Sequence, residues 1–395
     1  MVERKKAAAR ARPTCNCAAS YNPCMTPALD VCIRGAGIVG RTLALLLARE
    51  RLRVGLVRQG MAPSGARSDV RAYALNAASK DLLESVRGWP DAEHATPVLG
   101  MQVHGDEGGE LRFESQAQGA PALAWIVDVQ ALQDRLADAL RYQLVEWLEA
   151  PQPAALTAVC EGKASATRAE FGVQFEITPY HQQAIAARVN CDKPHAQIAR
   201  QWFADGEILA FLPLGGAGPG AGGNSVAIVW SVHEQRAARL LGLDAPAFEA
   251  QLEAASHGAL GQLKLASDRA AWPLQLARAD RWCGPGWVLA GDAAHTVHPL
   301  AGQGLNLGLA DARELAQVLH RREYWRGVGD AKLLRRYERS RKADVLAMGV
   351  ATDGLQQLFA RSAQPWGLLR NWGMTGFDRS GPLKDWVARQ AMGRI

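Results

Sequence analysis

The chain has 395 residues, 48% of them hydrophobic, and can therefore bury a large core and divide into two or three domains. Every apolar run is shorter than the roughly 18 residues that span a bilayer, and seven cysteines without a CxxC pair argue against a disulfide framework or a zinc site and fit a reducing cytoplasm. The net charge is +6, but the scattered arginines carry no recognition motif, so we expect no nucleic-acid partner. The basic surface suits anionic lipid headgroups, the phosphates of a nicotinamide dinucleotide, or plain solvation.

Residues 1–27 are rich in Ala, Lys and Arg and lack the apolar core of a secretory signal. We expect them to be disordered. Their basic, nearly acid-free composition resembles a mitochondrial transit peptide, but an extension upstream of a start at Met25 explains them as well, and we favour that interpretation.

A glycine-rich turn follows the first predicted strand, at residues 29–33, and begins a helix with an apolar face. In a βαβ unit, Gly35, Gly37 and Gly40 would supply the tight turn, the close approach of the backbone to a pyrophosphate, and close helix-to-strand contact. The sequence therefore predicts a Rossmann-like dinucleotide-binding domain.

The second predicted strand, at residues 52–57, is followed by Arg58, where such domains usually place an acid on the adenosine ribose. One interpretation is that Arg58 selects a 2′-phosphate and that the domain binds NADP. The other is that FAD binds, with Arg58 stacking on adenine or contacting phosphate, and with the ribose held less well. Residues 287–308 favour the second interpretation, because they join an apolar strand, an acid and a glycine-rich helix start that suit a flavin.

Further elements follow in the middle of the chain. We expect a helix at 129–144, a strand at 144–147 and, after a Pro151-Gln-Pro153 turn, a strand at 155–159 that ends near Glu161 and Gly162. Alternating residues at 101–113 predict a hairpin. Segments of β character predict a mostly antiparallel sheet; they are 174–189, 202–214 and 225–232. The glycine-rich stretch 215–223 would be a mobile lid or a plain loop.

Residues 287–308 join an apolar strand, an acid and a glycine-rich helix start. Asp292, after Gly291, lies at the carboxyl end of the strand, where its carboxylate can accept hydrogen bonds from a sugar-alcohol chain. Gly302 and Gly304 would let backbone amides approach a ring edge, and the helix that they begin, at 305–319, would stabilise negative charge on a reduced flavin.

The string from Gly291 to Gly308 resembles the second FAD motif of the aromatic hydroxylases related to p-hydroxybenzoate hydroxylase, in their ubiquinone-biosynthesis branch. With gaps, the resemblance runs from about Leu29 to the C-terminus. It implies an α/β fold: a Rossmann-like FAD-binding domain, a mostly antiparallel β-sheet substrate domain and a helical C-terminal tail. We divide the chain into a disordered extension (1–27), a discontinuous FAD-binding domain (28–95, 124–172 and 278–345), a substrate domain (96–123 and 173–277) and a C-terminal helical region (346–395). The crossover before Glu161 is too short for the β-ribbon that family members usually insert.

The resemblance also implies site residues. Arg71 would reach toward the flavin, the alternative being a salt bridge to Asp69 or Asp81. Glu161 and Gly162 stand where the family has Asp-Gly, which faces the FAD pyrophosphate and is implicated in NAD(P)H use, the alternative being a plain turn. The flavin-ring environment would come from Pro299, Gly302 and Gly304, with backbone amides of Leu305 and Asn306 facing the C2 oxygen. His295 and His298 are titratable, but a structural role is equally compatible, so we assign no catalytic base and no metal.

The activity implied is that of an FAD-dependent monooxygenase that uses NAD(P)H and dioxygen, through a C4a-hydroperoxyflavin, to hydroxylate a prenylated phenol of ubiquinone biosynthesis. The expected partners are this lipid-like aromatic substrate and a quinone-biosynthesis complex. We expect the protein to be cytoplasmic and in peripheral contact with the inner membrane face. Aromatic and arginine residues of the tail would lie at that membrane or pack on the protein, and we favour packing. The alternative function is a non-catalytic flavoprotein scaffold of the complex.

Overall fold

The structure is a computed structural model that describes residues 29–58, 69–105, 108–215, 223–296 and 303–360. The predicted extension at 1–27, the loop at 216–222 and the aromatic tail after residue 360 lie outside these residues. Within them, no helix is both long enough and apolar enough to cross a membrane.

The first of three sheets is the predicted dinucleotide-binding sheet. Its strand order is β16 (Cys283–Gly284), β17 (Trp287–Leu289), β9 (Ala154–Val159), β1 (Leu29–Arg34), β2 (Val54–Val57) and β8 (Val145–Leu148), parallel except for β16. The central strand β1 pairs Val31 with Val54 on one side and with Leu156 on the other, and all three side chains are buried. Such double-sided burial is typical of parallel strands covered on both faces.

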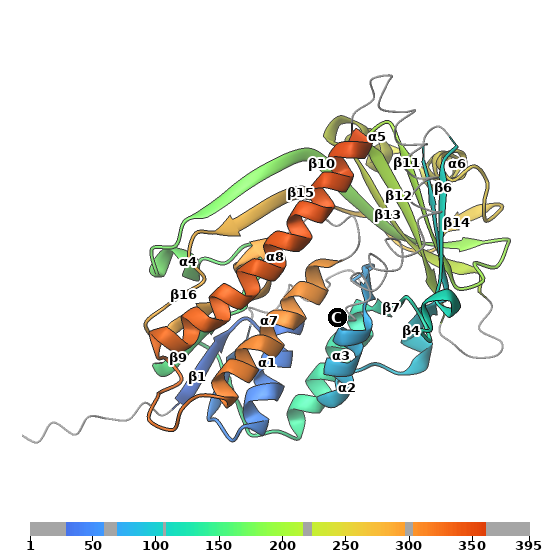
Figure 1. Ribbon diagram of the computed structural model, residues 1–395. Helices are drawn as coiled ribbons and strands as arrows, with labels where there is room; N and C mark the ends of the chain where they lie inside the picture. Colours follow the sequence, from blue (N-terminus) through green and yellow to red (C-terminus); the bar gives the residue numbers. More distant parts are fainter. Residues whose placement is uncertain (1–28, 59–68, 106–107, 216–222, 297–302, 361–395) are drawn as a thin grey trace, which may run out of the picture.

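Four helices accompany this sheet: α1 (Ile38–Arg49), α3 (Val129–Arg141), α7 (Gln303–His320) and α8 (Ala331–Ala360). Helix α1 packs against α3 and α7, and α7 packs against α8 (Figure 1). Asp128 begins α3 by accepting hydrogen bonds from the backbone of Gln130 and Ala131, as an N-cap does. The predicted helix at 129–144 thus begins at the expected residue but ends at Arg141, and the predicted second strand begins two residues late, at Val54.

The second sheet is large and mostly antiparallel, as predicted. Its strand order is β18 (His295–Thr296), β15 (Ala270–Ala279), β10 (Phe175–Cys191), β13 (Ser225–His233), β12 (Glu207–Leu214), β11 (Ile198–Ala204), β5 (Gly100–His104) and β6 (Glu110–Glu114), with β14 (Leu263–Leu265) beside β10. The hairpin predicted at 101–113 is confirmed as β5 and β6. The segment of β character at 202–214 forms two strands, because left-handed residues Asp205 and Gly206 turn the chain between β11 and β12.

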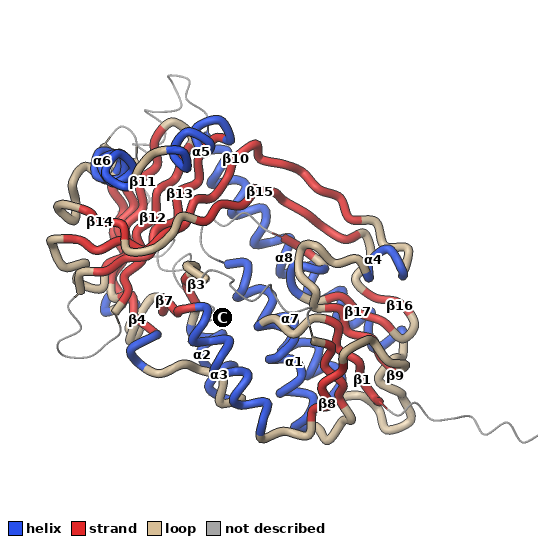
Figure 2. Tube along the Cα trace, turned by 180° about the vertical axis from the view of Figure 1, so that it is seen from behind, coloured by secondary structure: helices blue, strands red, loops and turns tan. Residues whose placement is uncertain are grey.

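One face of the large sheet carries α5 (Glu234–Gly242) and α6 (Ala245–Ala255) over a core that includes Trp230 and Phe248. The other face meets a small third sheet, of order β3 (Ala72–Leu75), β7 (Ala124–Asp128) and β4 (Ala95–Val98), which continues into α2 (Ala77–Ser85). Figure 2 shows β10 and β15 extending together from the large sheet toward α4 (Thr167–Glu170) beside the first sheet. Strands β10 and β15 therefore run without a break from the large sheet to the neighbourhood of the first sheet. The domain boundaries remain predictions.

Candidate functional site

Two of the three glycines after β1 are required by packing, and the third leaves open space. Gly35 has φ +109°, and a Cβ there would lie 2.5 Å from the carbonyl oxygen of Cys160. A Cβ on Gly40 would lie 1.9 Å from the carbonyl oxygen of Gly35, whereas one on Gly37 would meet nothing within 4 Å. The turn is therefore held against β9 on one side and is open at Gly37, at the N-terminus of α1, where backbone N–H groups can face an anion.

The end of β2 is occupied by a surface contact with the neighbouring strand. The Nε of Arg58 lies 3.2 Å from a carboxylate oxygen of Glu149, and the guanidinium lies 5.5 Å from the ring centroid of Trp147. The Arg58 side chain is 58% exposed. Its position thus combines an ion pair with cation–π stacking at the edge strand β8.

The turn after β17 is held by a buried charged network. Asp311, inside α7, accepts hydrogen bonds at Oδ2 from the backbone of Gly291 (2.8 Å) and from Nε2 of His295 (2.7 Å), and at Oδ1 from Nε of Arg341 (2.7 Å). Burial acts to raise the pKa of Asp311, but His295 and Arg341 outweigh it and hold the pKa below its ordinary value. His295 also stacks on Trp282. These contacts give His295 a structural position in the turn.

Asp292 differs from its buried neighbour because its carboxylate has no hydrogen-bond partner among the described residues. Burial raises the pKa of Asp292, against the opposing effects of Lys163, His295 and Arg71. A carboxylate set into the protein without donors is destabilised unless a ligand supplies them. Hydroxyl groups of a ribityl chain are such donors.

Arg71 makes the alternative contact expected for it, with Asp69 and not Asp81. Its Nε lies 2.8 Å from Asp69 Oδ1, its second nitrogen lies 2.5 Å from Oδ2, and its third donates to the hydroxyl of Tyr73 at 3.3 Å. The electrostatic effect of Asp292 reaches both Arg71 and Tyr73. The ion pair with Asp69 and the contact with Tyr73 therefore fix the guanidinium at a place where Asp292 still acts on it electrostatically.

Glu161 accepts hydrogen bonds from the hydroxyls of Ser165 at 2.7 Å and Thr167 at 2.8 Å. Thr167 in turn accepts one from Arg34, the last residue of β1, at 3.1 Å. Gly162 follows with φ +74°. The Glu161 segment is thus a structured turn that is linked through Thr167 to Arg34, just before the first glycine turn. The carboxylate of Glu161 is bound by hydroxyl groups of the protein itself.

Arg168 connects this turn with the one that carries Asp292. It is buried, donates to the carbonyl oxygens of Lys163 (2.6 Å) and Ala293 (3.2 Å), and lies 3.7 Å over the ring centroid of Phe175. One side chain therefore fixes the spacing between the Glu161 and Asp292 segments.

The start of α7 is anchored by Asn306. Its side-chain oxygen accepts from the backbone of Asn76 (3.0 Å) and the hydroxyl of Ser79 (2.7 Å), and its nitrogen donates to the carbonyl of Ala74 (2.9 Å). This anchoring role was not predicted for the side chain. Gly304 has open space where a Cβ would be, Leu305 packs against the core, and Pro299, Gly302 and His298 lie outside the described residues.

Sequence reasoning gave no role to Asp311, Arg341, Tyr73 or Arg34. Asp311 could have been found, because it stands four positions after Leu307 and four before Leu315, and an acid on the apolar face of a helix signals a paired, buried group. The described residues contain no group of three or more histidine, cysteine or acidic side chains placed to hold a metal.

This geometry defines a dinucleotide-binding α/β protein: an open glycine turn after β1 and an acid without donors after β17. A family model described as FAD binding domain matches residues 152–350. The chain is 30% identical, over 93% of its length and 90% of the relative's, to ubiquinone hydroxylase UbiL of Rhodospirillum rubrum. It is 29% identical, over 92% of its length and 98% of the relative's, to 3-demethoxyubiquinol 3-hydroxylase of Escherichia coli.

Solved structures show the same fold. Pseudomonas aeruginosa PqsL in complex with 2-aminobenzoylacetate aligns with a TM-score of 0.72 at 21% identity, covering 88% of this chain and 99% of PqsL. The p-nitrophenol 4-monooxygenase PnpA of Pseudomonas putida aligns with a TM-score of 0.70 at 16% identity, covering 93% and 99%. The chain belongs to the FAD binding domain family. It is an FAD-dependent monooxygenase with NAD(P)H as co-substrate, as the resemblance implied.

Proposed function

We propose that this monooxygenase hydroxylates the ring of a prenylated phenol intermediate of ubiquinone biosynthesis. The observation that carries the proposal is the apolar junction between the large sheet and the third sheet, where Leu214 and Ala227 pack with Val98 and Ile126. This junction is next to the strand that carries Tyr73, beside the turn residues assigned to the flavin. These side chains are buried against one another, and an apolar environment at that place suits an isoprenoid-bearing ring better than a hydrophilic acid.

The charges on this side of the sheet support the same conclusion. Arg188 lies on β10 and forms an ion pair with Asp128, the N-cap of α3. A small aromatic acid would need a cation for its carboxylate, and Arg188 is already engaged. Relatives named as ubiquinone-pathway hydroxylases, similar over nearly their full length, agree with a quinone precursor.

Within this proposal, the chain's own residues would bind and orient FAD. The turn at Gly35, Gly37 and Gly40 would take the pyrophosphate at the N-terminus of α1, and Asp292 would accept the ribityl hydroxyls. Amides of Leu305 and Asn306 at the start of α7 would stabilise negative charge at the ring edge. Arg71, Glu161 and Gly162 would complete the cofactor surface, with Arg58 at the adenosine end and Pro299, Gly302 and Gly304 around the ring.

The chemistry that bound FAD would supply is electron transfer from NAD(P)H to dioxygen, which would be the source of the inserted oxygen atom. The protein's part is to place an electron-rich ring carbon beside the flavin and to exclude water, so that oxygen is not lost as hydrogen peroxide. We further propose that the protein works in the cytoplasm, in peripheral contact with the inner membrane face and with other quinone-biosynthesis enzymes.

The test is to measure NAD(P)H oxidation and hydroxylated product together for phenols with prenyl tails of increasing length. Each buried methylene contributes about 0.8 kcal/mol, so KM should fall steeply over the first isoprene units. The unprenylated phenol should be poorly coupled and should release hydrogen peroxide. Efficient coupling with only a small hydrophilic acid would overturn the quinone assignment and leave the monooxygenase class intact.

A further inference from the structure

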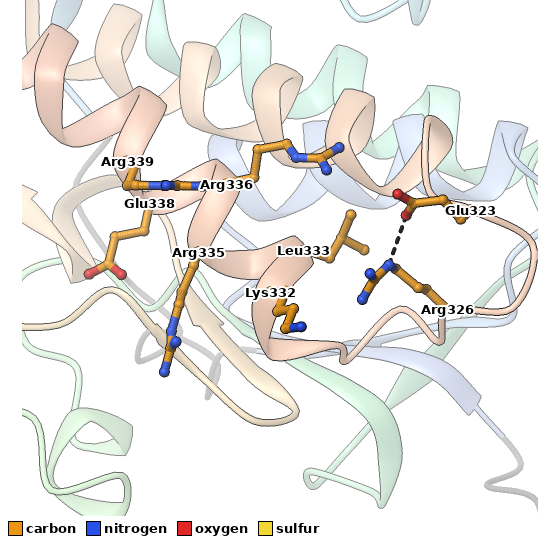
Figure 3. A pocket seen from close by; sticks show the side chains of 8 residues that line it. All are labelled: Glu323, Arg326, Lys332, Leu333, Arg335, Arg336, Glu338 and Arg339. Atoms are coloured by element: carbon orange, nitrogen blue, oxygen red, sulfur yellow. Dashed lines mark ion pairs between the residues drawn. The ribbon is translucent and has the colours of Figure 1, made fainter.

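A surface pocket lies away from the flavin turns, where α8 begins. Its volume is about 440 Å³, and its lining includes Glu323 and Arg326 of the preceding loop and basic residues of α8. Figure 3 shows the Arg326 side chain turned toward Glu323, and Lys332 and Arg335 extending from the first turns of α8. Nothing in the proposed reaction uses this surface.

Four cations of α8 form one stripe on the helix: Lys332, Arg335, Arg336 and Arg339. They stand at positions i, i+3, i+4 and i+7, which share one helix face. All four are exposed, whereas Leu333, Leu334 and Tyr337 on the other side of the helix are buried. We call this set the α8 basic stripe.

The acids that line the pocket form their ion pairs with cations outside the stripe, and only Glu323 also acts electrostatically on a stripe residue, Arg336. Glu323 lies 2.9 Å from Arg326. Glu338 pairs with Lys342 at 2.8 Å and accepts a hydrogen bond from the backbone of Trp282 at 2.9 Å. Within the described residues, the four cations of the stripe have no hydrogen-bond or ion-pair partner. Like charges three and four positions apart repel one another, so an external anion would relieve an existing repulsion.

The loop before α8 presents the stripe on a preformed support. Arg326 bridges Glu323 and Asp330, and Asp330 caps α8 by accepting from the backbone of Lys332 (2.9 Å) and Leu333 (3.0 Å). A Cβ on Gly329 would lie 2.2 Å from the carbonyl oxygen of Ala155, so the loop packs directly on β9. Binding here would therefore need little ordering of the chain.

Two large aromatic side chains project from the same loop. Tyr324 is 95% exposed and Trp325 is 67% exposed, and they contact one another edge to face with centroids 4.9 Å apart. Exposed aromatics next to clustered cations are typical of the membrane interface, where amphipathic rings lie at headgroup level and Lys or Arg meets phosphate. A free phosphate would use the cations and leave both rings in water.

We propose that the α8 basic stripe, with Tyr324 and Trp325, is the surface by which this protein docks on an anionic phospholipid bilayer. The chemistry recognised is the net negative charge of an anionic headgroup, whose phosphate is not neutralised by a cation of the same lipid, and the rings insert at headgroup depth. The inference deepens the membrane contact proposed above by naming its surface. The four cations and two aromatic residues of this surface are all among the described residues, and none belongs to the aromatic tail.

The experiment is sedimentation of the flavin-loaded full chain with vesicles of phosphatidylcholine alone or with 30% phosphatidylglycerol added. We expect binding to the anionic vesicles only, and weaker binding as salt increases. Each basic residue near such a surface contributes about fivefold to partitioning, so Arg335→Gln/Arg336→Gln should weaken binding about 25-fold. Tyr324→Ser/Trp325→Ser should weaken it at least about fivefold at unchanged net charge. The matched control is Arg135→Gln/Arg239→Gln, which removes two exposed cations from α3 and α5.

Several outcomes would overturn the proposal. The control pair could weaken binding as much as the stripe pair, which would mean a general charge effect. Stripe and aromatic variants could both bind normally, which would place the contact elsewhere. Millimolar inorganic phosphate or a single-stranded RNA oligonucleotide could displace the protein from vesicles by occupying the stripe, which would identify a free phosphate or a nucleic acid as the ligand. Hydroxylation of a detergent-dispersed prenylated phenol, measured on the same variants, should stay at the wild-type rate, so failure of docking and failure of the proposed function are distinguishable.

Discussion

Asp311 on α7 and Arg341 on α8 form a buried ion pair, with 2.7 Å between Oδ1 and Nε, and the same carboxylate holds the backbone N–H of Gly291. The two helices are thereby connected to the turn that carries Asp292. A buried pair of this kind contributes little net stability when intact, but removing one partner leaves an uncompensated charge. Its main effect is to fix the geometry of that turn.

We predict that Asp311→Asn lowers the free energy of unfolding by about 3–5 kcal/mol and lowers the flavin content of the purified protein. Because the pKa of Asp311 is held below its ordinary value, this stabilisation is present above the unfolded-state pKa of about 3.9 and is lost as the pH falls through the folded-state pKa. Urea unfolding and the flavin-to-protein absorbance ratio measure both effects. Asp344→Asn, which removes the exposed partner of Arg341, is the control and should cost less than about 1 kcal/mol. Equal effects of the two variants would contradict the network's role.

Asp292→Asn is expected to have opposite effects on stability and on binding. It removes a half-buried charge that has no hydrogen-bond donor among the described residues, so the flavin-free protein should gain up to about 1 kcal/mol. FAD should bind at least about tenfold more weakly, because the ribityl hydroxyls lose a charged acceptor. Thermal melting of the apo-protein and FAD titration test the two signs separately. Wild-type flavin affinity in the variant would remove Asp292 from the cofactor site.

The pH dependence of FAD binding provides the control for this variant. Because burial raises the pKa of Asp292 in the flavin-free protein and the hydroxyls favour its charged form, wild-type affinity should fall as the pH drops through that raised pKa. Asp292→Asn should lack this component.

Gly37→Ala and Gly40→Ala form a matched pair, because they add the same methyl group to one turn. At Gly40 the methyl would meet the carbonyl of Gly35 at 1.9 Å, so we expect a loss of about 3 kcal/mol or more in the free energy of unfolding. At Gly37 it meets nothing within 4 Å, so the protein should fold with a loss of about 1 kcal/mol or less. It should nevertheless lose FAD affinity, because the methyl occupies space proposed for the pyrophosphate. Normal affinity in Gly37→Ala would contradict the proposed phosphate position.

Arg58→Glu is predicted to tighten FAD binding severalfold, because an acid at this position can accept the ribose hydroxyls. The change removes a solvent-exposed ion pair with Glu149, so stability should change by less than about 1 kcal/mol. Titration of apo-protein with FAD measures the effect. Glu149→Gln, which frees Arg58 without adding an acid, should leave the affinity within about twofold. Weaker binding by Arg58→Glu would mean that the arginine makes a favourable contact of its own.

The elements that local sequence patterns specify were predicted closely. Strand β1 and helix α7 differ from the predicted 29–33 and 305–319 by one or two residues, because glycine turns and apolar periodicity mark their ends. Pairings between distant segments were not predictable in this way. The parallel pairing of β11 with β5 and the separate sheet of β3, β7 and β4 depend on contacts that no local pattern encodes.

The same distinction holds for the candidate site. The glycines and Asp292 are visible in the sequence because their spacing around strands is local. The contact of Asp311 with Arg341 and the bridge from Arg168 to Ala293 join different elements and become visible only in the fold. The variants of Gly37, Arg58 and Asp292 test whether these predicted residues hold FAD.

The strand order of the first sheet has a consequence for how the protein is made. Strand β17 pairs with β9 and is followed by α7, which packs on α1, so the sheet that begins with β1 is completed by segments near the other end of the described chain. A ribosome therefore releases β1, β2, β8 and β9, together with α1 and α3, long before α7, α8, Asp292 and Asp311 exist. During that interval the half-built sheet exposes apolar strands to other nascent chains, which favours aggregation. Chaperone supply and a slow rate of translation should accordingly improve the yield of flavin-loaded protein more than added FAD does.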